Sequence, residues 1–250
     1  RLVGDTMIPS GEMTFATGNG GLCYRCHNSR VEDAEATAVN SFRGAHHGPQ
    51  ADMFLGKNGI AFGLPFASNS AHGVVVEDSC VECHMAEAPE SGPGVIQPPQ
   101  VGEHSFAMRD EAEGVINVEN ACTQCHTGLD TYDLQAGGDY DGDGIIEGTQ
   151  TEVRGLLELL RPGLLEISGM SLADDGTLSI SEEDFANLTE DQKKARYNHN
   201  FVVEDGSYGV HNTSYSVQLL QRTYAAVYGN PITEDFPNID LRGPVQGMEP

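Results

Sequence analysis

The spacing of apolar residues along the chain predicts helices in its C-terminal part. Residues 151–160 carry apolar side chains at helical spacing, and Pro162 is expected to end or kink that helix. A second helix is expected over residues 181–201, because a serine and three acidic residues that suit a helix N-terminus open it. A third is expected over residues 212–228, where Gly229 follows the last apolar position.

The N-terminal part of the chain, residues 1–130, shows little periodicity of either kind. One short helix is expected over residues 31–38. The chain holds 30 Gly and 12 Pro, and only 38% of its residues are hydrophobic. A core built from such residues would be thin, so we expect that something besides side chains fills part of the interior. The predicted fold is mainly α, with extensive irregular coil and little or no sheet.

Charge narrows the classes of partner. The chain has 38 Asp and Glu against 13 Lys and Arg, a formal net charge of −25. Such a surface repels nucleic acid and anionic membranes and favours basic partners or cations. No apolar run is long enough to span a bilayer. Because the chain opens at Arg1 without an apolar leader, we expect a mature secreted form whose signal peptide has been removed.

All six cysteines belong to one motif, Cys-x-x-Cys-His, which occurs three times. Its members are Cys23, Cys26 and His27, then Cys80, Cys83 and His84, then Cys122, Cys125 and His126. This is the attachment signature of c-type haem. Two thiols three residues apart reach the two vinyl groups of one porphyrin as thioethers, and the adjacent imidazole reaches the iron. The motif predicts three covalently attached haems, with the three histidines as proximal ligands.

Other uses of paired cysteines fit this sequence less well. A redox dithiol, half of a zinc site and a local disulfide all use Cys-x-x-Cys, but none needs a histidine directly after the second cysteine. A zinc site would also pair two motifs and leave the third unexplained. Resemblance to known c-type cytochromes implies that haem is attached on the outer side of the cytoplasmic membrane, so the expected location is periplasmic or extracellular.

Six histidines remain outside the motifs, and they are the candidates for the second axial positions. In order of preference the candidate distal ligands are His211, His104, His72, His47 and His46, with His199 ranked last. His46 could instead serve a second haem or a haem propionate. Two imidazoles close an iron to outside ligands, which suits electron transfer, whereas an open position suits catalysis. The surplus of histidines favours closed sites and argues against an enzyme.

An acidic loop between the two parts of the chain resembles the opening of an EF-hand calcium loop. Asp139, Asp141 and Asp143 occupy positions 1, 3 and 5, a glycine occupies position 6, and Ile145 would offer its carbonyl at position 7. Position 12 departs from the pattern because it is Gln150.

Glu147 or Glu152 would have to replace the missing twelfth ligand. We expect a structural calcium ion here; the alternative is a solvated acidic turn.

These features divide the chain into four regions. Residues 1–130 form the haem-binding region and residues 131–150 the calcium-type loop. Residues 151–230 form a helical region that supplies a distal ligand. Residues 231–250 form a Pro-rich tail, which is expected to dock on its own or a neighbouring subunit.

Two segments resemble a known family. Residues 196–202 and 209–212, followed by a long helix, resemble the C-terminal segment of cytochromes related to the pentahaem ammonia-forming nitrite reductases. Residues 80–85, which end Cys-His-Met, are similar in kind. The resemblance implies that His211 is a distal haem ligand. Those reductases carry a catalytic haem with a lysine ligand, and no Cys-x-x-Cys-Lys occurs here, so nitrite reduction is not implied.

A second resemblance concerns the function of the chain. As a small, loop-rich multihaem protein, the chain is similar to subunits of extracellular cytochrome filaments, in which haems of successive subunits stack. The sequence therefore predicts an electron-transfer protein, either polymerised into a conductive filament or a soluble shuttle. Its partners would be redox proteins or extracellular electron acceptors. The alternative is a small multihaem oxidoreductase acting on nitrite, hydroxylamine or a sulfur oxyanion at one open haem.

Overall fold

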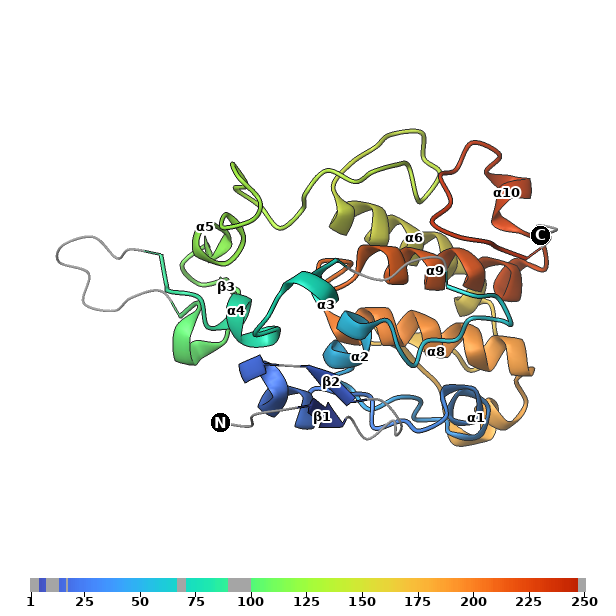
Figure 1. Ribbon diagram of the computed structural model, residues 1–250. Helices are drawn as coiled ribbons and strands as arrows, with labels where there is room; N and C mark the ends of the chain where they lie inside the picture. Colours follow the sequence, from blue (N-terminus) through green and yellow to red (C-terminus); the bar gives the residue numbers. More distant parts are fainter. Residues whose placement is uncertain (1–4, 8–13, 17, 67–70, 90–99, 247–250) are drawn as a thin grey trace.

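The computed structural model describes residues 5–7, 14–16, 18–66, 71–89 and 100–246 (Figure 1). Its helices are α1 (Ala34–Asn40), α2 (Gln50–Leu55), α3 (His72–Val75), α4 (Cys80–His84), α5 (Val118–Cys122), α6 (Thr149–Leu165), α7 (Glu182–Ala186), α8 (Glu190–Asp205), α9 (Thr213–Tyr228) and α10 (Ile232–Asp235). Two 3-10 segments are η1 (Gly18–Arg25) and η2 (Glu103–Ser105).

Strands among the described residues form three short antiparallel pairs. These are β1 (Asp5–Met7) with β2 (Thr14–Ala16), β3 (Arg109–Asp110) with β4 (Val115–Ile116), and β5 (Ser171–Leu172) with β6 (Leu178–Ser179). The expectation of a mainly α fold with little sheet is confirmed. No helix in the described part of the chain is both long and apolar enough to cross a bilayer.

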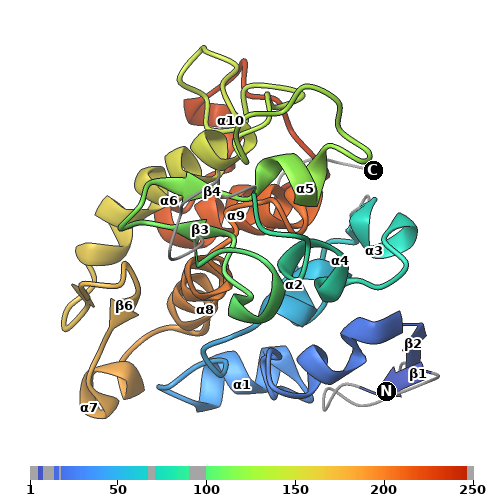
Figure 2. The same ribbon diagram turned by 90° about the vertical axis from the view of Figure 1, so that its left-hand side faces the viewer.

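Helix α9 is the centre of the packed core. Helices α6 and α8 both pack against it, and α1 and α2 pack on α8 (Figures 1 and 2). Every residue of α9 from Ser214 to Tyr224 is buried. The apolar side chains expected at helical spacing in α6 (Val153, Leu156, Leu157 and Leu160) all lie in this core. Most of the buried apolar side chains thus come from the C-terminal half of the chain.

Capping residues define the ends of the long helices. The side chain of Asn212 accepts a hydrogen bond from the backbone N–H of Tyr215 and starts α9, and Gly229 ends it in the left-handed region with φ of 82°. These are the favoured residues at the two ends of a helix. The helix expected over residues 212–228 is therefore confirmed.

The other long helices differ from the expected boundaries at two points. The segment 181–201 is not one helix: α7 ends at Ala186, and Thr189 starts α8 with a capping box that pairs it with Gln192. Pro162 does not end α6, which continues to Leu165. Because the proline lies in the last turn, its missing N–H removes only one of the final hydrogen bonds.

Arg222 ties the C-terminal segment to the core. Its buried guanidinium donates to the backbone oxygens of Pro244, Leu64 and Pro65, at 3.0, 3.2 and 2.7 Å. Gln221 beside it donates to the backbone oxygen of Asp240. The tail described as far as residue 246 therefore packs on its own chain; residues 247–250 lie outside the described residues.

The three Cys-x-x-Cys-His segments lie together on one side of the molecule. Helix α4 packs against η1 on one side and α5 on the other. In Figure 2, α5, α4 and the blue segment that holds η1 follow one another across the face turned to the viewer. The fold thus brings the three motifs into one continuous row.

Candidate functional site

Each motif forms a single helical turn. The backbone N–H groups of Cys26 and His27 donate to the oxygen of Cys23 at 3.1 and 2.9 Å. The third motif repeats this geometry around Cys122, with the same two distances, and the second motif is α4 itself. Residues three and four apart share a helix face, so each turn presents two thiols and one imidazole on the same side.

Thiols of successive motifs are neighbours. The Cys80 thiol hydrogen-bonds to Cys23 and lowers the pKa of Cys23 to about 6 against the effect of burial. Burial raises the pKa of Cys83 to about 11, with a further contribution from Cys122 of the third motif. The second motif therefore lies between the first and the third.

Side-chain hydrogen bonds hold this order in place. Asn19, at the start of η1, binds both carboxylate oxygens of Asp78 through its backbone and side-chain nitrogens, at 2.8 and 2.7 Å. On the other side, Asn117 and Asn120 both donate to the backbone oxygen of Glu87, at 3.1 and 2.9 Å. The row of motifs is thus fixed by contacts that precede α4 and follow it.

The side chains around the motifs leave large apolar surfaces uncovered. The three most exposed large apolar side chains of the described residues are Val74 at 84%, Leu22 at 68% and Val75 at 67%. Leu22 directly precedes the first motif, and the two valines follow His72 in α3. The buried cluster in this region is small, formed by Tyr24 and Ala51. An apolar group of substantial area would bury this surface.

Two histidines of this region donate to backbone oxygens. The Nδ1 atoms of His84 and His72 lie 2.8 Å from the oxygen of Phe106 and 3.0 Å from that of Val210. A carbonyl only accepts, so in both rings Nδ1 carries the hydrogen and Nε2 carries the lone pair. Burial lowers the pKa of both histidines, which favours the neutral form that binds metals.

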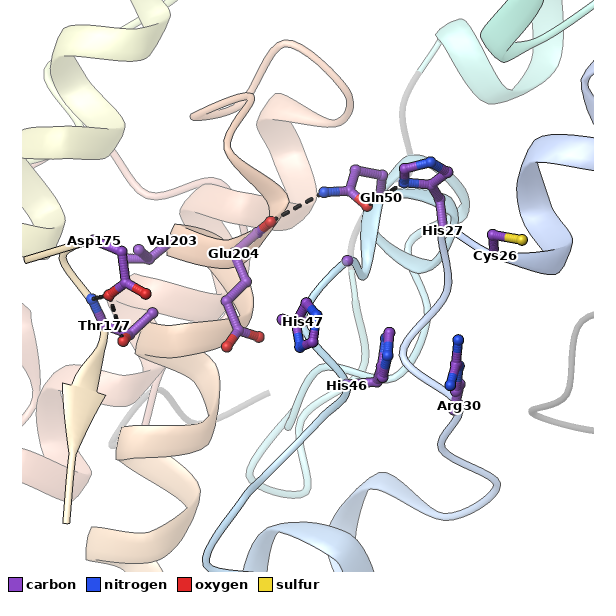
Figure 3. Close-up of a pocket in the computed structure, with 11 residues that line it drawn as sticks. Cys26, His27, Arg30, His46, His47, Gln50, Asp175, Thr177, Val203 and Glu204 are labelled. Carbon is purple, nitrogen blue, oxygen red and sulfur yellow. Dashed lines mark hydrogen bonds between the residues drawn. The ribbon is translucent and has the colours of Figure 1, made fainter. Parts of the chain in front are cut away.

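Two further histidines donate to side chains. Nδ1 of His27 lies 3.2 Å from Oε1 of Gln50, whose amide nitrogen donates to the oxygen of Glu204 (Figure 3). Nδ1 of His211 lies 2.7 Å from Oδ1 of Asp205. In the neutral rings these acceptors again leave the lone pair on Nε2. Burial lowers the pKa of His211, but the Asp205 carboxylate outweighs it and raises that pKa overall.

Three of these histidines, together with His126, form two close ring pairs. The ring centroids of His84 and His211 lie 6.2 Å apart, and those of His72 and His126 lie 6.0 Å apart. Each pair joins one motif histidine to one candidate distal ligand. Two metal–imidazole bonds of about 2 Å, end to end, plus about 1 Å from each nitrogen to its ring centre, give about 6 Å between centroids.

His27 faces a pocket instead of a single ring. The pocket has a volume of about 650 Å³, which is of cofactor size, and His46 and His47 also line it (Figure 3). Their rings are stacked, with centroids 4.4 Å apart. Nδ1 of His46 is shielded from solvent and has no hydrogen-bond partner. Two candidate distal ligands thus lie by the first motif.

Two histidines are not brought to a motif in this way. His104 lies in η2 with an exposed side chain, and its ring is paired with no motif histidine in the described part of the chain. His199 is buried in α8, where its Nδ1 contacts Asn200 and its Nε2 has no hydrogen-bond partner. Burial lowers the pKa of His199 to about 4.

The acidic loop brings carboxylates together in two overlapping groups. Asp139, Asp141 and Glu152 have oxygens within 4.8 Å of one another, and so do Asp141, Asp143 and Glu147. Both glutamates proposed as replacements for the twelfth position are therefore present. Gln150, at that position, instead donates to the oxygen of Ser207. The side chain of Ile145 is exposed, at 59%.

The local backbone folds around these carboxylates. Asp139 accepts hydrogen bonds from the N–H groups of Gly142 and Gly144, at 2.7 and 2.9 Å. Buried Glu152, from the first turn of α6, accepts from Tyr140 at 2.7 Å. Burial raises the pKa of Asp141 to about 6, with added repulsion from its acidic neighbours. One oxygen of Glu147 is buried without a hydrogen-bond partner.

Sequence reasoning missed the residues that orient the imidazoles. Gln50 and Asp205 lie far from any motif in the chain, and the acceptors of His72 and His84 are backbone atoms. A backbone acceptor cannot be recognised from the type of residue that carries it. The one signal in the sequence was Asp205, an acidic residue six positions before His211 that could accept its hydrogen.

Comparison of the chain with family models, curated proteins and solved structures finds no match. The resemblances drawn from the sequence therefore stay predictions.

The buried, neutral His199 predicts acid-sensitive stability. The free energy of unfolding should fall by up to about 3 kcal/mol as the pH falls from 6.5 to 4. In this range the histidine is protonated in the unfolded chain but stays neutral in the folded protein. In His199→Leu this part of the loss should vanish. Denaturant titrations of both proteins across this pH range measure the difference. Identical pH profiles would contradict the buried neutral state.

Proposed function

We propose that this chain is a trihaem c-type cytochrome that transfers electrons from haem to haem, with a structural calcium ion in its acidic loop. The cysteines of each motif tether one haem, and His27, His84 and His126 are the proximal ligands. The observation that carries the proposal is the row of three Cys-x-x-Cys-His turns with further histidines beside them; the ring separations of 6.2 and 6.0 Å are of the size expected for two imidazoles on one iron.

The pairs assign distal ligands within this proposal. His211 is the partner of His84, and His72 is the partner of His126. The third site is His27 with one of His46 and His47, which line the same pocket. His104 remains a candidate from the sequence without a contact that supports it.

Three features of the chain fit haem. The Nδ1–H groups of His27, His72, His84 and His211 are held by acceptors, which orients Nε2 as metal-binding imidazoles require. Exposed Leu22, Val74 and Val75 offer apolar surface for a porphyrin to cover. His46 and His47 add two imidazoles to the pocket that His27 lines.

Bound haem supplies one-electron oxidation and reduction of its iron. The chain supplies proximity and order: Cys80 of the second motif contacts Cys23 of the first, and Cys83 lies by Cys122 of the third. Thioether-bearing edges of successive haems would therefore be neighbours, which suits stepwise electron transfer.

A second candidate function has one observation in its favour. The pocket of about 650 Å³ at His27 is the place where an iron could keep an open position. A small oxidoreductase acting on nitrite, hydroxylamine or a sulfur oxyanion would use that site. Two adjacent histidines in the same pocket favour a closed iron and hence the electron carrier.

Location and partners belong to the same proposal. A net charge of −25 favours basic redox partners, and covalent haem attachment goes with a periplasmic or extracellular location. Transfer to extracellular acceptors through a filament of copies stays a prediction from the sequence.

Closed irons predict a spectroscopic result. The oxidised protein should show only low-spin haem by visible and EPR spectroscopy, and carbon monoxide should leave the reduced spectrum unchanged. In His211→Ala, one haem of three should become high-spin and bind carbon monoxide. His104→Ala, at an exposed histidine, is the matched control and should behave as the unaltered protein.

Carbon monoxide binding by the unaltered protein would favour the oxidoreductase instead. A haem opened by His104→Ala and not by His211→Ala would overturn the ligand pairing.

The calcium ion rests on the spacing and the fold of the acidic loop together. Asp139, Asp141 and Glu152 converge with little exposure, and burying such carboxylates is costly without a cation. Helix α6 approaches so closely at Gly155 that a Cβ there would overlap the carboxylate of Asp141. The ion would thus join the loop to α6.

Calcium should stabilise the protein through these residues. At about 100 times its dissociation constant, calcium should add about 2.7 kcal/mol to the free energy of unfolding relative to chelator. Asp141→Asn should lose this gain, whereas Asp174→Asn, which removes an exposed charge outside the loop, should keep it. Denaturant titration and calorimetry measure both. No heat of calcium binding, or an unchanged gain in Asp141→Asn, would contradict the site.

A further inference from the structure

The imidazole of His211 has a charged hydrogen-bond acceptor, unlike the other oriented histidines of the site. Its Nδ1 lies 2.7 Å from Oδ1 of Asp205, whose side chain is 1% exposed. The corresponding acceptors of His72 and His84 are backbone carbonyls, and that of His27 is the amide oxygen of Gln50. These three acceptors are neutral. Among these four histidines, His211 is therefore the one whose Nδ1 contacts a full negative charge.

The carboxylate of Asp205 is held rigidly for this contact. Its other oxygen, Oδ2, accepts hydrogen bonds from the backbone N–H and the hydroxyl of Ser207. The same hydroxyl accepts from the backbone N–H of His211 at 3.1 Å. Gly206, with φ of 74°, lets the chain turn back after α8 so that these groups meet. Asp205, Ser207 and His211 thus form one closed network.

Stability of the helix does not explain an acid at this place. Asp205 is the last residue of α8, where the helix dipole disfavours negative charge. Burial of a carboxylate adds to that cost unless it is paired. Its ion-pair partner in the described part of the chain is His211. The contact with the imidazole and the two donors of Ser207 together offset the cost of the charge.

We infer that Asp205 is a positioning residue that acts through His211 to lower the reduction potential of the haem held by His84 and His211 below the potentials of the other two. The inference rests on the proposed function. A carboxylate that accepts the Nδ1 hydrogen makes the imidazole a stronger donor at Nε2. A stronger donor stabilises the oxidised iron over the reduced iron. A neutral acceptor does this less.

A lowered potential at this haem matters for electron transfer because the haem lies between the other two. Its motif contacts both of the others, through Cys80 and through Cys83. The middle site is then the one least occupied by an electron at equilibrium, and it limits exchange between the two outer sites.

The test compares reduction potentials in holoprotein. Asp205→Asn keeps the shape and an acceptor oxygen but removes the charge. Spectroelectrochemical titration should show the potential of one of three haems raised by at least about 59 mV, which lowers its oxidised-to-reduced ratio about tenfold at a fixed applied potential. Intact mass and the low-spin spectrum should remain unchanged. Glu190→Gln, which removes an exposed charge at the other end of α8, should leave that haem's potential in place.

A double-mutant cycle assigns the shift. In a His211→Ala background, Asp205→Asn should no longer move the potential, because the contact is already lost. If Asp205→Asn does not fold, Ser207→Ala replaces it, since it removes the hydroxyl that orients Oδ2; a shift confined to the same haem is expected.

The possible results distinguish a failure of the role of Asp205 from a failure of the proposed haem function. Three haems with unchanged potentials in the variants, or an equal shift in Glu190→Gln, would overturn the role of Asp205 alone. A purified protein without covalently bound haem would overturn the proposed function and this inference with it.

Discussion

Hydrogen bonds to the last turn of α8 and to the short connection that leads to α9 are the constraint on which the arrangement of the candidate site depends. Gln50 accepts from His27 and donates to the backbone oxygen of Glu204. His72 donates to the backbone oxygen of Val210, and His211 donates to the carboxylate of Asp205. Residues 204–211 thus receive contacts from α2 and α3 and orient His211 by a contact within the segment. The connection is anchored at both ends by buried helices of the core. Imidazoles that the N-terminal half could not hold alone are positioned by the packed half.

The two halves differ in how they gain stability. The C-terminal half buries apolar side chains from α6, α8 and α9 in a conventional core. The motif region buries little of its own and leaves Leu22, Val74 and Val75 exposed. Under the proposed function, porphyrin faces supply the missing apolar contact. The acidic loop, whose Tyr140 oxygen binds Gln221 of α9, joins α6 and the C-terminal segment to the core.

Local features of this structure were predictable from the sequence, and long-range pairings were not. The turn geometry of each motif follows from the spacing of its residues, and α9 follows from Asn212, an apolar face and Gly229. The break between α7 and α8 was missed because the acidic start at residue 181 masked the stronger cap at Thr189. The pairing of His84 with His211 joins residues far apart in the chain. Spacing along a sequence carries no information on such a contact.

The central claim is that the three motifs bind haem covalently, and the intact mass of the denatured protein tests it most directly. Protein from a host able to attach haem c should exceed the mass of its polypeptide by three haem groups, because thioether bonds survive unfolding. A double Cys80→Ala, Cys83→Ala variant should carry one haem fewer. A mass equal to that of the polypeptide alone would contradict the claim, and so would zinc in the native protein that is lost on denaturation.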